Sequence, residues 1–422
     1  MMIRILPGDF RRMAWTDRKN GYFELLSCSA DSCGGGYFRG ETRYLADVFL
    51  CPEDHADLYR INAAETLVQP EGMTVIFNRP SSAHPSGSLG LHVSLLINEQ
   101  AFWLSLSASR VFDSSRGSAA VPHAGFGLVF DSSLSGGRWT RAEHGSAVVW
   151  HNHAGAAIAS VSPFTVESPD RDRAVLYAEG STNPGWYLAF ESTPERACAK
   201  AASLAASDAV CAHRKSVAEF VDSCALDTGD PAFDSAVKWA RFSGWMLAVN
   251  DHGPGIWAGL PWFRDNWGRD TFIALSGILL TSGRFKEARE VLVSFARHQN
   301  KDPESPDWGR IPNRFRGSND VIYNTADGTL WFIRSLWEYL QYTGDLEILE
   351  ELGPTVDLAL ESDAARRTDL NGLLLHGDAD TWMDARIRGN EPWSPRGDRA
   401  NDIQSLWYTA LVIGSRIARL KG

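Results

Sequence analysis

The residue pattern of the sequence changes near residue 192, which indicates two parts with different folds. Before this point, short runs that alternate apolar and polar residues are separated by turn-forming clusters, which is typical of β-strands. After residue 230, apolar residues recur every three or four positions, as they do on one face of an α-helix. The chain has 422 residues, so each half is long enough to form a core of its own.

The first half contains eight runs with strand character, which are rich in β-branched or aromatic residues. These runs are 44–50, 73–77, 91–97, 101–107, 127–130, 147–151, 174–178 and 186–190. Many short strands with regular turn signals are typical of an antiparallel sandwich. We therefore predict an antiparallel β-sandwich domain over residues 1–191.

A helical segment follows the predicted sandwich. Ser192, Thr193, Pro194 and Glu195 form a helix-start signal, with proline in the first turn. Residues 193–223 are rich in Ala, Lys, Arg and Glu and contain no glycine. We predict a linker helix within residues 192–229.

The pattern predicts six helices in residues 230–422. Their approximate bounds are 232–249, 270–282, 284–299, 326–342, 345–361 and 402–419. Long loops rich in Gly, Pro, Asn and Asp separate some of them, at 251–269, 300–324 and 363–401. Loops of this length on a helical scaffold are usually functional or disordered, and the aromatic and charged residues of these loops favour function.

Tryptophan is concentrated in the helical half, where eleven of the sixteen tryptophans follow residue 231. Five of these stand at helical spacing and are predicted core residues: Trp239, Trp245, Trp331, Trp337 and Trp407. Three stand in loops and are predicted to face a ligand: Trp262, Trp267 and Trp382. An exposed indole can stack on a sugar ring or on a cation.

The first group of candidate site residues is Trp262, Arg269 and Asp270, which immediately precede a predicted helix or begin it. An Arg–Asp pair beside indoles can bind a polyhydroxylated ring, because the carboxylate accepts from hydroxyls and the guanidinium donates to oxygens. The alternative is that Asp270 only caps the helix and pairs with Arg269.

A second group contains Arg314, Asn324 and Asp327, again just before a predicted helix. Asn324 and Asp327 could point into a shared cavity. The alternative is ordinary N-capping, which Asn and Asp both perform.

A third group surrounds Asp384, which lies in a loop beside Trp382 and Met383. Partial desolvation there would raise the carboxyl pKa, as a general acid working near neutral pH requires. Arg386 or Arg396 could offset that rise. The alternative is a surface Asp in a turn.

Net charge and hydropathy limit the kinds of partner that the protein can bind. The formal net charge is −11, which disfavours nucleic acid and anionic membranes. No apolar run approaches the ~18 residues of a membrane span, and the first twenty residues lack the apolar run of a signal peptide. We therefore expect a cytoplasmic protein.

The sequence implies neither a metal nor an organic cofactor. Cys28 and Cys33 do not have a zinc-finger spacing, and His151 and His153 are a pair without a third ligand. We expect the six cysteines to be reduced.

An ordered series of motifs carries a family resemblance. The series is PWFRDNWGRDTFIALSG, GRFKEAREVLVSFARHQ, IPNRF, YNTADGTLWF, YLQYTGD, DTWMDAR, SPRG and LWYTAL. It covers nearly all of residues 231–422 and resembles the C-terminal domain of glycogen debranching enzymes, the amylo-α-1,6-glucosidase family. Gly34 to Tyr37 and Glu41 to Tyr44 are similar to elements of that family's N-terminal sandwich.

The resemblance implies a β-sandwich joined to an (α/α)6 toroid that cleaves α-1,6-linked glucosyl stubs from branched α-glucans with inversion. It implies that Asp384 is the general acid. Residues expected around the glucosyl pocket are Trp262, Arg269, Asp270, Asn324 and Asp327, and we group Arg314, Trp382 and Arg396 with them as candidate substrate-binding residues.

An (α/α)6 toroid needs twelve helices, and six are predicted before Gly422. The family's general base follows the acid well downstream, so we expect it beyond Gly422. The sequence then predicts a truncated enzyme with little or no turnover, which reading the coding DNA past Gly422 would test. Two alternatives stay open: a non-catalytic glucan-binding protein, and another toroidal glycosidase such as a glucoamylase or trehalase.

Overall fold

The structure is a computed structural model that describes most of the chain. The described residues are 2–6, 11–26, 36–51, 63–78, 87–110, 125–130, 139–141, 148–150, 155–160, 164–167, 173–178, 185–223 and 226–421. They form two compact units, Met1–Phe242 and Ser243–Gly422. The boundaries predicted from the sequence, at 191/192 and 229/230, stay a prediction. Cys28, Cys33, Cys224, His151 and His153 lie outside the described residues.

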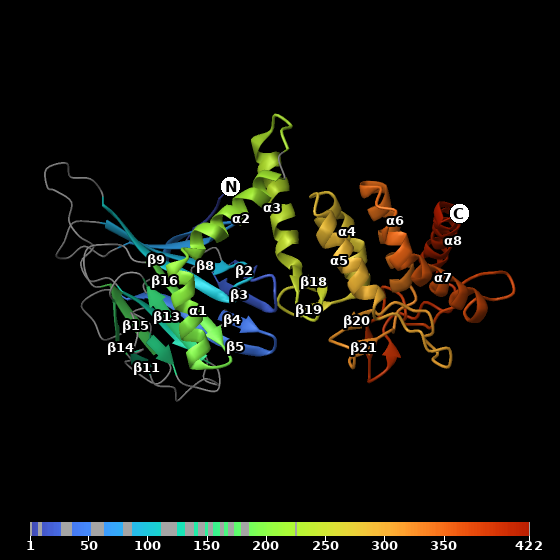
Figure 1. The fold of residues 1–422 in the computed structure, drawn as a ribbon, viewed down its shortest axis with the longest axis horizontal. Helices are drawn as coiled ribbons and strands as arrows, with labels where there is room; N and C mark the ends of the chain where they lie inside the picture. Colours follow the sequence, from blue (N-terminus) through green and yellow to red (C-terminus); the bar gives the residue numbers. More distant parts are fainter. Residues whose placement is uncertain are drawn as a thin grey trace. The chain divides into compact units, whose positions relative to one another are not determined.

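The first unit contains two antiparallel sheets (Figure 1). The nine-stranded sheet has the order β1 (Ile3–Ile5), β6 (Ala63–Gln69), β7 (Gly72–Asn78), β8 (Gly87–Leu96), β9 (Ala101–Arg110), β16 (Gly185–Glu191), β13 (Gly155–Ser160), β12 (Val148–Trp150) and β11 (Trp139–Arg141). The seven-stranded sheet has the order β14 (Phe164–Glu167), β15 (Arg173–Ala178), β10 (Gly125–Phe130), β5 (Thr42–Cys51), β4 (Gly36–Arg39), β3 (Gly21–Leu26) and β2 (Arg12–Thr16).

Aromatic side chains from the two sheets form a shared core. Phe23 of β3 meets Phe102 of β9 edge to face, with ring centroids 5.1 Å apart. Tyr37 of β4 stacks on Phe190 of β16 at 5.2 Å. All four side chains are buried. The sheets therefore face each other across one core, and the predicted antiparallel sandwich is confirmed.

The eight predicted strands coincide with β5, β7, β8, β9, β10, β12, β15 and β16. The alternation rule missed the other described strands of this unit. Strand β13, for example, has the sequence GAAIAS, whose alanines and glycine have low strand propensity. It is a strand because it pairs with β12 on one side and β16 on the other, which buries Ala157 and Ile158.

The predicted linker helix is two helices, α1 (Pro194–Ala206) and α2 (Ala209–Ser223). Thr193 caps α1, because its side chain accepts a hydrogen bond from the Arg196 backbone N–H. Asp208, between the helices, has a φ of 50°, in the left-handed region that interrupts a helix. Ala197 and Ala201 pack with Ala157 and Ala189 of the nine-stranded sheet, so α1 covers a sheet face.

Six further helices follow, at the positions that the pattern predicts. They are α3 (Pro231–Leu247), α4 (Gly268–Leu275), α5 (Phe285–Ala296), α6 (Gly328–Thr343), α7 (Ile348–Arg366) and α8 (Asn401–Lys421), with a π-helical turn η2 (Ser276–Leu280) directly after α4. Gly344 ends α6 with a φ of 67°, a left-handed conformation that glycine adopts at helix ends without steric cost.

Helices α4, α5 and α6 share one hydrophobic core. Phe272 of α4 contacts Phe295 of α5 and Phe332 of α6, with ring centroids 4.8 Å and 5.4 Å away. Of the five predicted core tryptophans, Trp245 and Trp407 are buried, whereas the others are only partly buried.

The long loops of the second unit carry short antiparallel strands. They are β17 (Ala248–Asn250), β18 (Pro254–Gly259) and β19 (Phe263–Asn266), then β20 (Arg314–Phe315) with β21 (Val321–Ile322), and β22 (Arg386–Ile387) with β23 (Glu391–Pro392). Figure 1 shows β18 to β21 at the end of the bundle where α4 and α6 begin. Among the described helices, none has the length and apolar character that crossing a membrane requires.

Candidate active site

The start of α4 is held by a loop that approaches its backbone closely. The Gly268 N–H donates to the Asn313 carbonyl at 2.6 Å. A Cβ at Gly268 would lie 2.5 Å from the Pro312 carbonyl oxygen, so only glycine fits without movement. This contact fixes the position from which the side chain of the next residue, Arg269, projects from the helix.

Arg269 connects two carboxylates from separate segments. Its Nε donates to Asp327 Oδ2 at 2.7 Å, and its Nη2 donates to Asp327 Oδ1 at 3.0 Å. Its Nη1 donates to Asp384 Oδ2 at 2.7 Å. The guanidinium therefore brings together the start of α4, the start of α6 and the loop before β22. This fork geometry is a strong form of charge-assisted hydrogen bonding.

Burial and charge act against each other at this centre. Burial tends to lower the pKa of Arg269, but the hydrogen bonds from its guanidinium to Asp327 and Asp384 raise it overall. Burial raises the pKa of Asp327, although Arg269 opposes the rise. We treat the Arg269–Asp327 pair as ionised near neutral pH, because short bidentate contacts of this kind join charged partners.

Asp270 lies beside this centre in the first turn of α4, with its side chain exposed at the surface. Desolvation of its carboxyl raises its pKa, Arg269 opposes that rise, and the nearby carboxylates of Asp384 and Asp327 add to it. The alternative in which Asp270 pairs with Arg269 and caps the helix is not what the structure has. The N-cap residue is Trp267, and Arg269 bonds the other two carboxylates.

Asp327 stands at the N-cap position of α6 but makes no side-chain capping hydrogen bond. Its two oxygens contact Arg269 instead, so the capping alternative for Asp327 is not realised. Its neighbour Ala326 donates its backbone N–H to the Asp380 carbonyl at 2.9 Å. That bond ties the loop carrying Asp384 to the start of α6.

The environment of Asp384 differs from the sequence-based expectation. Its side chain is 41% exposed and Trp382 is 62% exposed, so the neighbouring residues do not bury the carboxylate. The arginine that contacts it is Arg269. Arg386 donates to Asn390, and Arg396 pairs with Asp402 at 2.7 Å. Proximity in sequence pointed to the wrong cations because the contact joins segments 115 residues apart.

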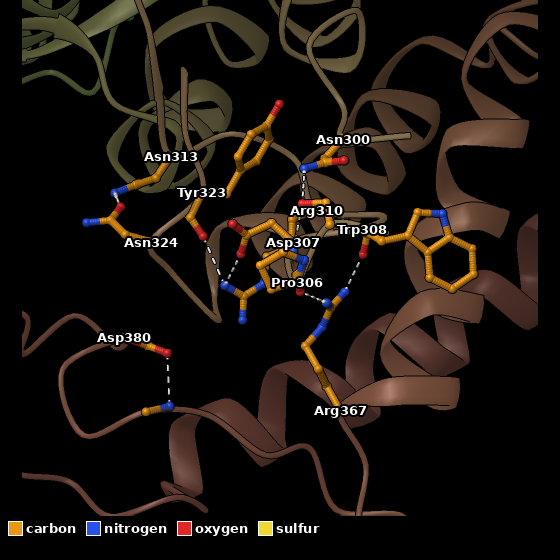
Figure 2. A network of polar contacts seen from close by, with 12 residues as sticks. Asn300, Pro306, Asp307, Trp308, Arg310, Asn313, Tyr323, Asn324, Arg367 and Asp380 are labelled. Atoms are coloured by element: carbon orange, nitrogen blue, oxygen red, sulfur yellow. Dashed lines mark hydrogen bonds and ion pairs between the residues drawn. The ribbon is translucent and has the colours of Figure 1, made fainter. Parts of the chain in front are cut away.

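Asn324 is close to the centre, whereas Arg314 and Arg396 have other partners. Asn313 donates from Nδ2 to Asn324 Oδ1 at 3.0 Å, a contact that Figure 2 shows at one side of the loop network. Arg314 binds Asp320 at 2.6 Å and lies over the Trp267 ring. The guanidinium of Arg396 lies 6.0 Å from the Trp382 ring centroid.

The predicted ligand-facing tryptophans fall into two groups. Trp262 is 78% exposed and Trp382 is 62% exposed, so both indoles are available for stacking. Trp267 is half-buried beneath Arg314. Their ligand contacts stay a prediction.

Sequence reasoning alone missed the residues that order the loop 300–324. Figure 2 shows Arg310 donating to Asp307 and to the Tyr323 carbonyl, at 3.1 Å and 2.9 Å. It also shows Arg367 of the α7 C-terminus donating to the carbonyls of Pro306 and Trp308. No local signal marks these contacts, because their acceptors are mostly backbone carbonyls.

Asn313 is a further residue that the sequence did not single out. It is 2% exposed and receives the Arg269 N–H on Oδ1 at 3.5 Å while it bonds Asn324. Its place in the IPNRF motif is the only signal that could have found it.

In the described part of the chain, no group of three His, Cys, Asp or Glu side chains is arranged to hold a metal ion.

Comparisons with known proteins identify the family of the chain. A family model described as Amylo-alpha-1,6-glucosidase matches residues 211–421. The glycogen debranching enzyme of Saccharomyces cerevisiae (strain ATCC 204508 / S288c) is 34% identical over 117 residues, which are 26% of this chain and 7% of that enzyme. The present chain thus corresponds to a small part of that relative's length.

A solved structure shows a similar fold. All of this chain aligns with 70% of a bacterial glucoamylase crystallised with acarbose, with a TM-score of 0.52 and 8% sequence identity. The family model and the yeast relative place the chain among the glycoside hydrolases. Within that class, it belongs to the amylo-α-1,6-glucosidase family, whose model spans half of its length.

Proposed function

We propose that this protein hydrolyses α-1,6-linked glucosyl stubs in glycogen-like branched glucans, with Asp384 as the general acid. The observation that carries the proposal is the position of Asp384. It is half-exposed, it stands in the family's Thr-Trp-Met-Asp motif, and Arg269 holds it beside Asp270 and Asp327. An acid must both reach the substrate and keep a defined orientation, and this carboxyl meets both conditions.

In the proposed reaction, protonated Asp384 gives its proton to the glycosidic oxygen. The bond from that oxygen to C1 breaks, and its electron pair stays on the leaving sugar. A water molecule attacks C1 from the opposite face and loses a proton to a base, which inverts the anomeric configuration. Inverting enzymes place acid and base roughly 6.5–9.5 Å apart to accommodate that water. We assign the base to none of the described residues.

The candidate binding residues suit a neutral sugar ring. Asp270 is exposed and can accept hydrogen bonds from hydroxyls, and Asn324 offers an exposed amide. The exposed indoles of Trp262 and Trp382 can stack on pyranose faces. We further propose that α3 to α8 are half of an (α/α)6 toroid, with these residues on the loops at the end where α4 and α6 begin.

Glucose release from a phosphorylase limit dextrin tests the proposal. Because no base is assigned, release by this chain should be slow, and the glucose should appear initially as the β-anomer, which NMR detects. Asp384→Asn should reduce the rate about 10²–10⁴-fold while dextrin binding is retained. Asp398→Asn is the matched control, because Asp398 is an exposed carboxylate of the same loop, and among the described residues its ion pair is with Arg399 at the surface.

The other outcomes are distinct. Dextrin binding without any glucose release from the unaltered chain would contradict hydrolysis and favour a non-catalytic glucan-binding protein. Faster release from maltose or trehalose than from limit dextrin would point to a different toroidal glycosidase.

A further inference from the structure

The two carboxylates that contact Arg269 are not equivalent. The Asp327 side chain is 4% exposed, and both of its oxygens accept hydrogen bonds from Arg269. The Asp384 side chain is 41% exposed, and only Oδ2 contacts Arg269. Within the described residues, Oδ1 of Asp384 receives no hydrogen bond. A sugar can therefore reach Asp384, whereas the Asp327 side chain is almost completely buried and bonded to Arg269.

The charges around Asp327 and Asp384 differ as well. A guanidinium has five N–H donors, and Asp327 engages two of them along one edge. The Arg269–Asp327 pair is then close to neutral as a unit. Asp384 is oriented by a hydrogen bond from this unit and does not face an unopposed cation. The 2.7 Å hydrogen bond therefore orients the carboxyl of Asp384 through an arginine whose charge Asp327 already balances.

We propose that Asp327 is a positioning residue that fixes Arg269 through both oxygens, so that Arg269 can orient Asp384 for proton transfer. This inference rests on the proposed role of Asp384. It assigns Asp327 no contact with the sugar, unlike the substrate-binding role expected from the sequence, and it leaves Asp270 as the exposed carboxylate available to hydroxyls.

Hydrogen bonds and burial hold the backbone around Asp327 in place. The Asp327 carbonyl accepts the Trp331 N–H at 2.9 Å in the first turn of α6, and Thr325 and Gly328 beside it are buried. The Ala326 N–H donates to the Asp380 carbonyl, so the loop that carries Asp384 begins close to Asp327. The distance between Asp327 and the loop is thereby set by backbone, and the direction of Asp384 is set by Arg269.

Two substrates separate positioning from sugar binding. Cleavage of limit dextrin needs a proton on the leaving oxygen, whereas α-D-glucosyl fluoride releases fluoride with little acid assistance. Asp327→Asn should lower kcat on limit dextrin about 10–100-fold, with kcat on the fluoride and KM on dextrin changed less than about 3-fold. Asp384→Asn should show the same selectivity with a larger loss on dextrin.

Asp363→Asn is the matched control. Asp363 is also buried and forms a 2.5 Å contact with an arginine, Arg367, in the same unit but apart from the site. Both Asn variants should lower the melting temperature, but Asp363→Asn should leave both rates unchanged. An equal loss on both substrates with Asp327→Asn, or a raised KM with unchanged kcat, would show that Asp327 binds sugar and would overturn the inference.

A second measurement decides the matter if the unaltered chain releases glucose from neither substrate, which would refute the proposed hydrolysis. Amide hydrogen exchange then reports the order of residues 383–386. Faster exchange there by about tenfold in Asp327→Asn, and not in Asp363→Asn, would support positioning. Unchanged exchange in both variants would contradict it.

Discussion

At the scale of single residues, the site depends on close contacts that tolerate little change. The side chain of Arg269 projects from α4 one residue after Gly268. The backbone of Gly268 contacts the loop at Pro312 and Asn313. The orientation of Arg269 therefore depends on a glycine that has no side chain to take part in binding or catalysis. A side chain at this position would have to displace backbone atoms, which cannot rotate away as a flexible side chain can.

We expect Gly268→Ala to destabilise the second unit by about 1–3 kcal/mol, because overpacking displaces the loop at Pro312. Urea unfolding followed by circular dichroism measures the change. Gly277→Ala is the control, since a Cβ at Gly277 meets nothing within 4 Å. That helical position should be neutral or gain up to about 1 kcal/mol. Equal effects of the two substitutions would refute the role given to the close approach.

At the scale of elements, single side chains attach helices to loops and turns. In the first unit, His213 of α2 reaches two turns of the nine-stranded sheet. Its Nε2 contacts the Glu71 carbonyl at 2.9 Å, and its Nδ1 lies 3.3 Å from the Ile97 N–H. This pair of contacts requires a neutral ring, with Nδ1 as acceptor and Nε2 as donor. Protonation would place two N–H groups against each other.

The stability of the first unit should fall as the pH is lowered below 6.5. Burial lowers the pKa of His213, and it lowers the pKa of His92 to about 4. In the unfolded chain these rings take up protons near their ordinary pKa of 6.5. Below that pH the unfolded state binds more protons, so the stabilisation is complete above pH 6.5 and is lost as the pH falls towards the folded pKa values.

His213→Gln tests this dependence, because the amide can keep one donor and one acceptor without titrating. The slope of unfolding free energy against pH between 5 and 6.5 should decrease, by at most about 1.4 kcal/mol per pH unit. Lys215→Gln changes an exposed residue of the same helix and should leave the slope unchanged. A slope that His213→Gln does not alter would contradict the expectation.

In the second unit, Arg367 at the end of α7 orders the loop 300–310 through two backbone carbonyls (Figure 2). Arg367→Met should cost about 3–5 kcal/mol, because the buried carboxylate of Asp363 loses its charged partner. The double variant Arg367→Met with Asp363→Leu should recover part of that loss, since apolar residues can replace a buried ion pair. Urea unfolding of both variants measures the difference in stability. A double variant no more stable than the single one would refute the explanation.

At the scale of the whole molecule, the proposed substrate is neutral while the chain carries a formal net charge of −11. A neutral glucan gains nothing from long-range electrostatic attraction. The binding centre offers hydrogen bonds and indole faces, which salt screens little compared with exposed ion pairs.

We therefore expect the affinity for limit dextrin to change less than about 2-fold between 50 mM and 500 mM NaCl, because no counterions are released on binding. Isothermal titration calorimetry at the two salt concentrations measures it. A decrease of tenfold or more would indicate an ionic ligand instead of a neutral sugar.

Part of the secondary structure could be predicted from the residue pattern alone. Period-2 alternation and period-3.6 repeats are local properties, so eight strands and six helices could be placed from them, and the ordered motifs were enough to recognise the family. Strands such as β13 escaped because most of their residues have low strand propensity and become strands only between paired neighbours. The break at Asp208 escaped because a residue with positive φ leaves no periodic signature.

Which charges meet depends on how the chain packs. Arg269, Asp327 and Asp384 could each be selected as candidates, but their pairing spans 58 and 115 residues of chain. Sequence neighbours suggested Arg386 or Arg396 for Asp384 and helix capping for Asp327. A hydrogen bond depends on distances of a few ångströms, and these are set by how α4, α6 and the loop before β22 pack, which local sequence does not encode.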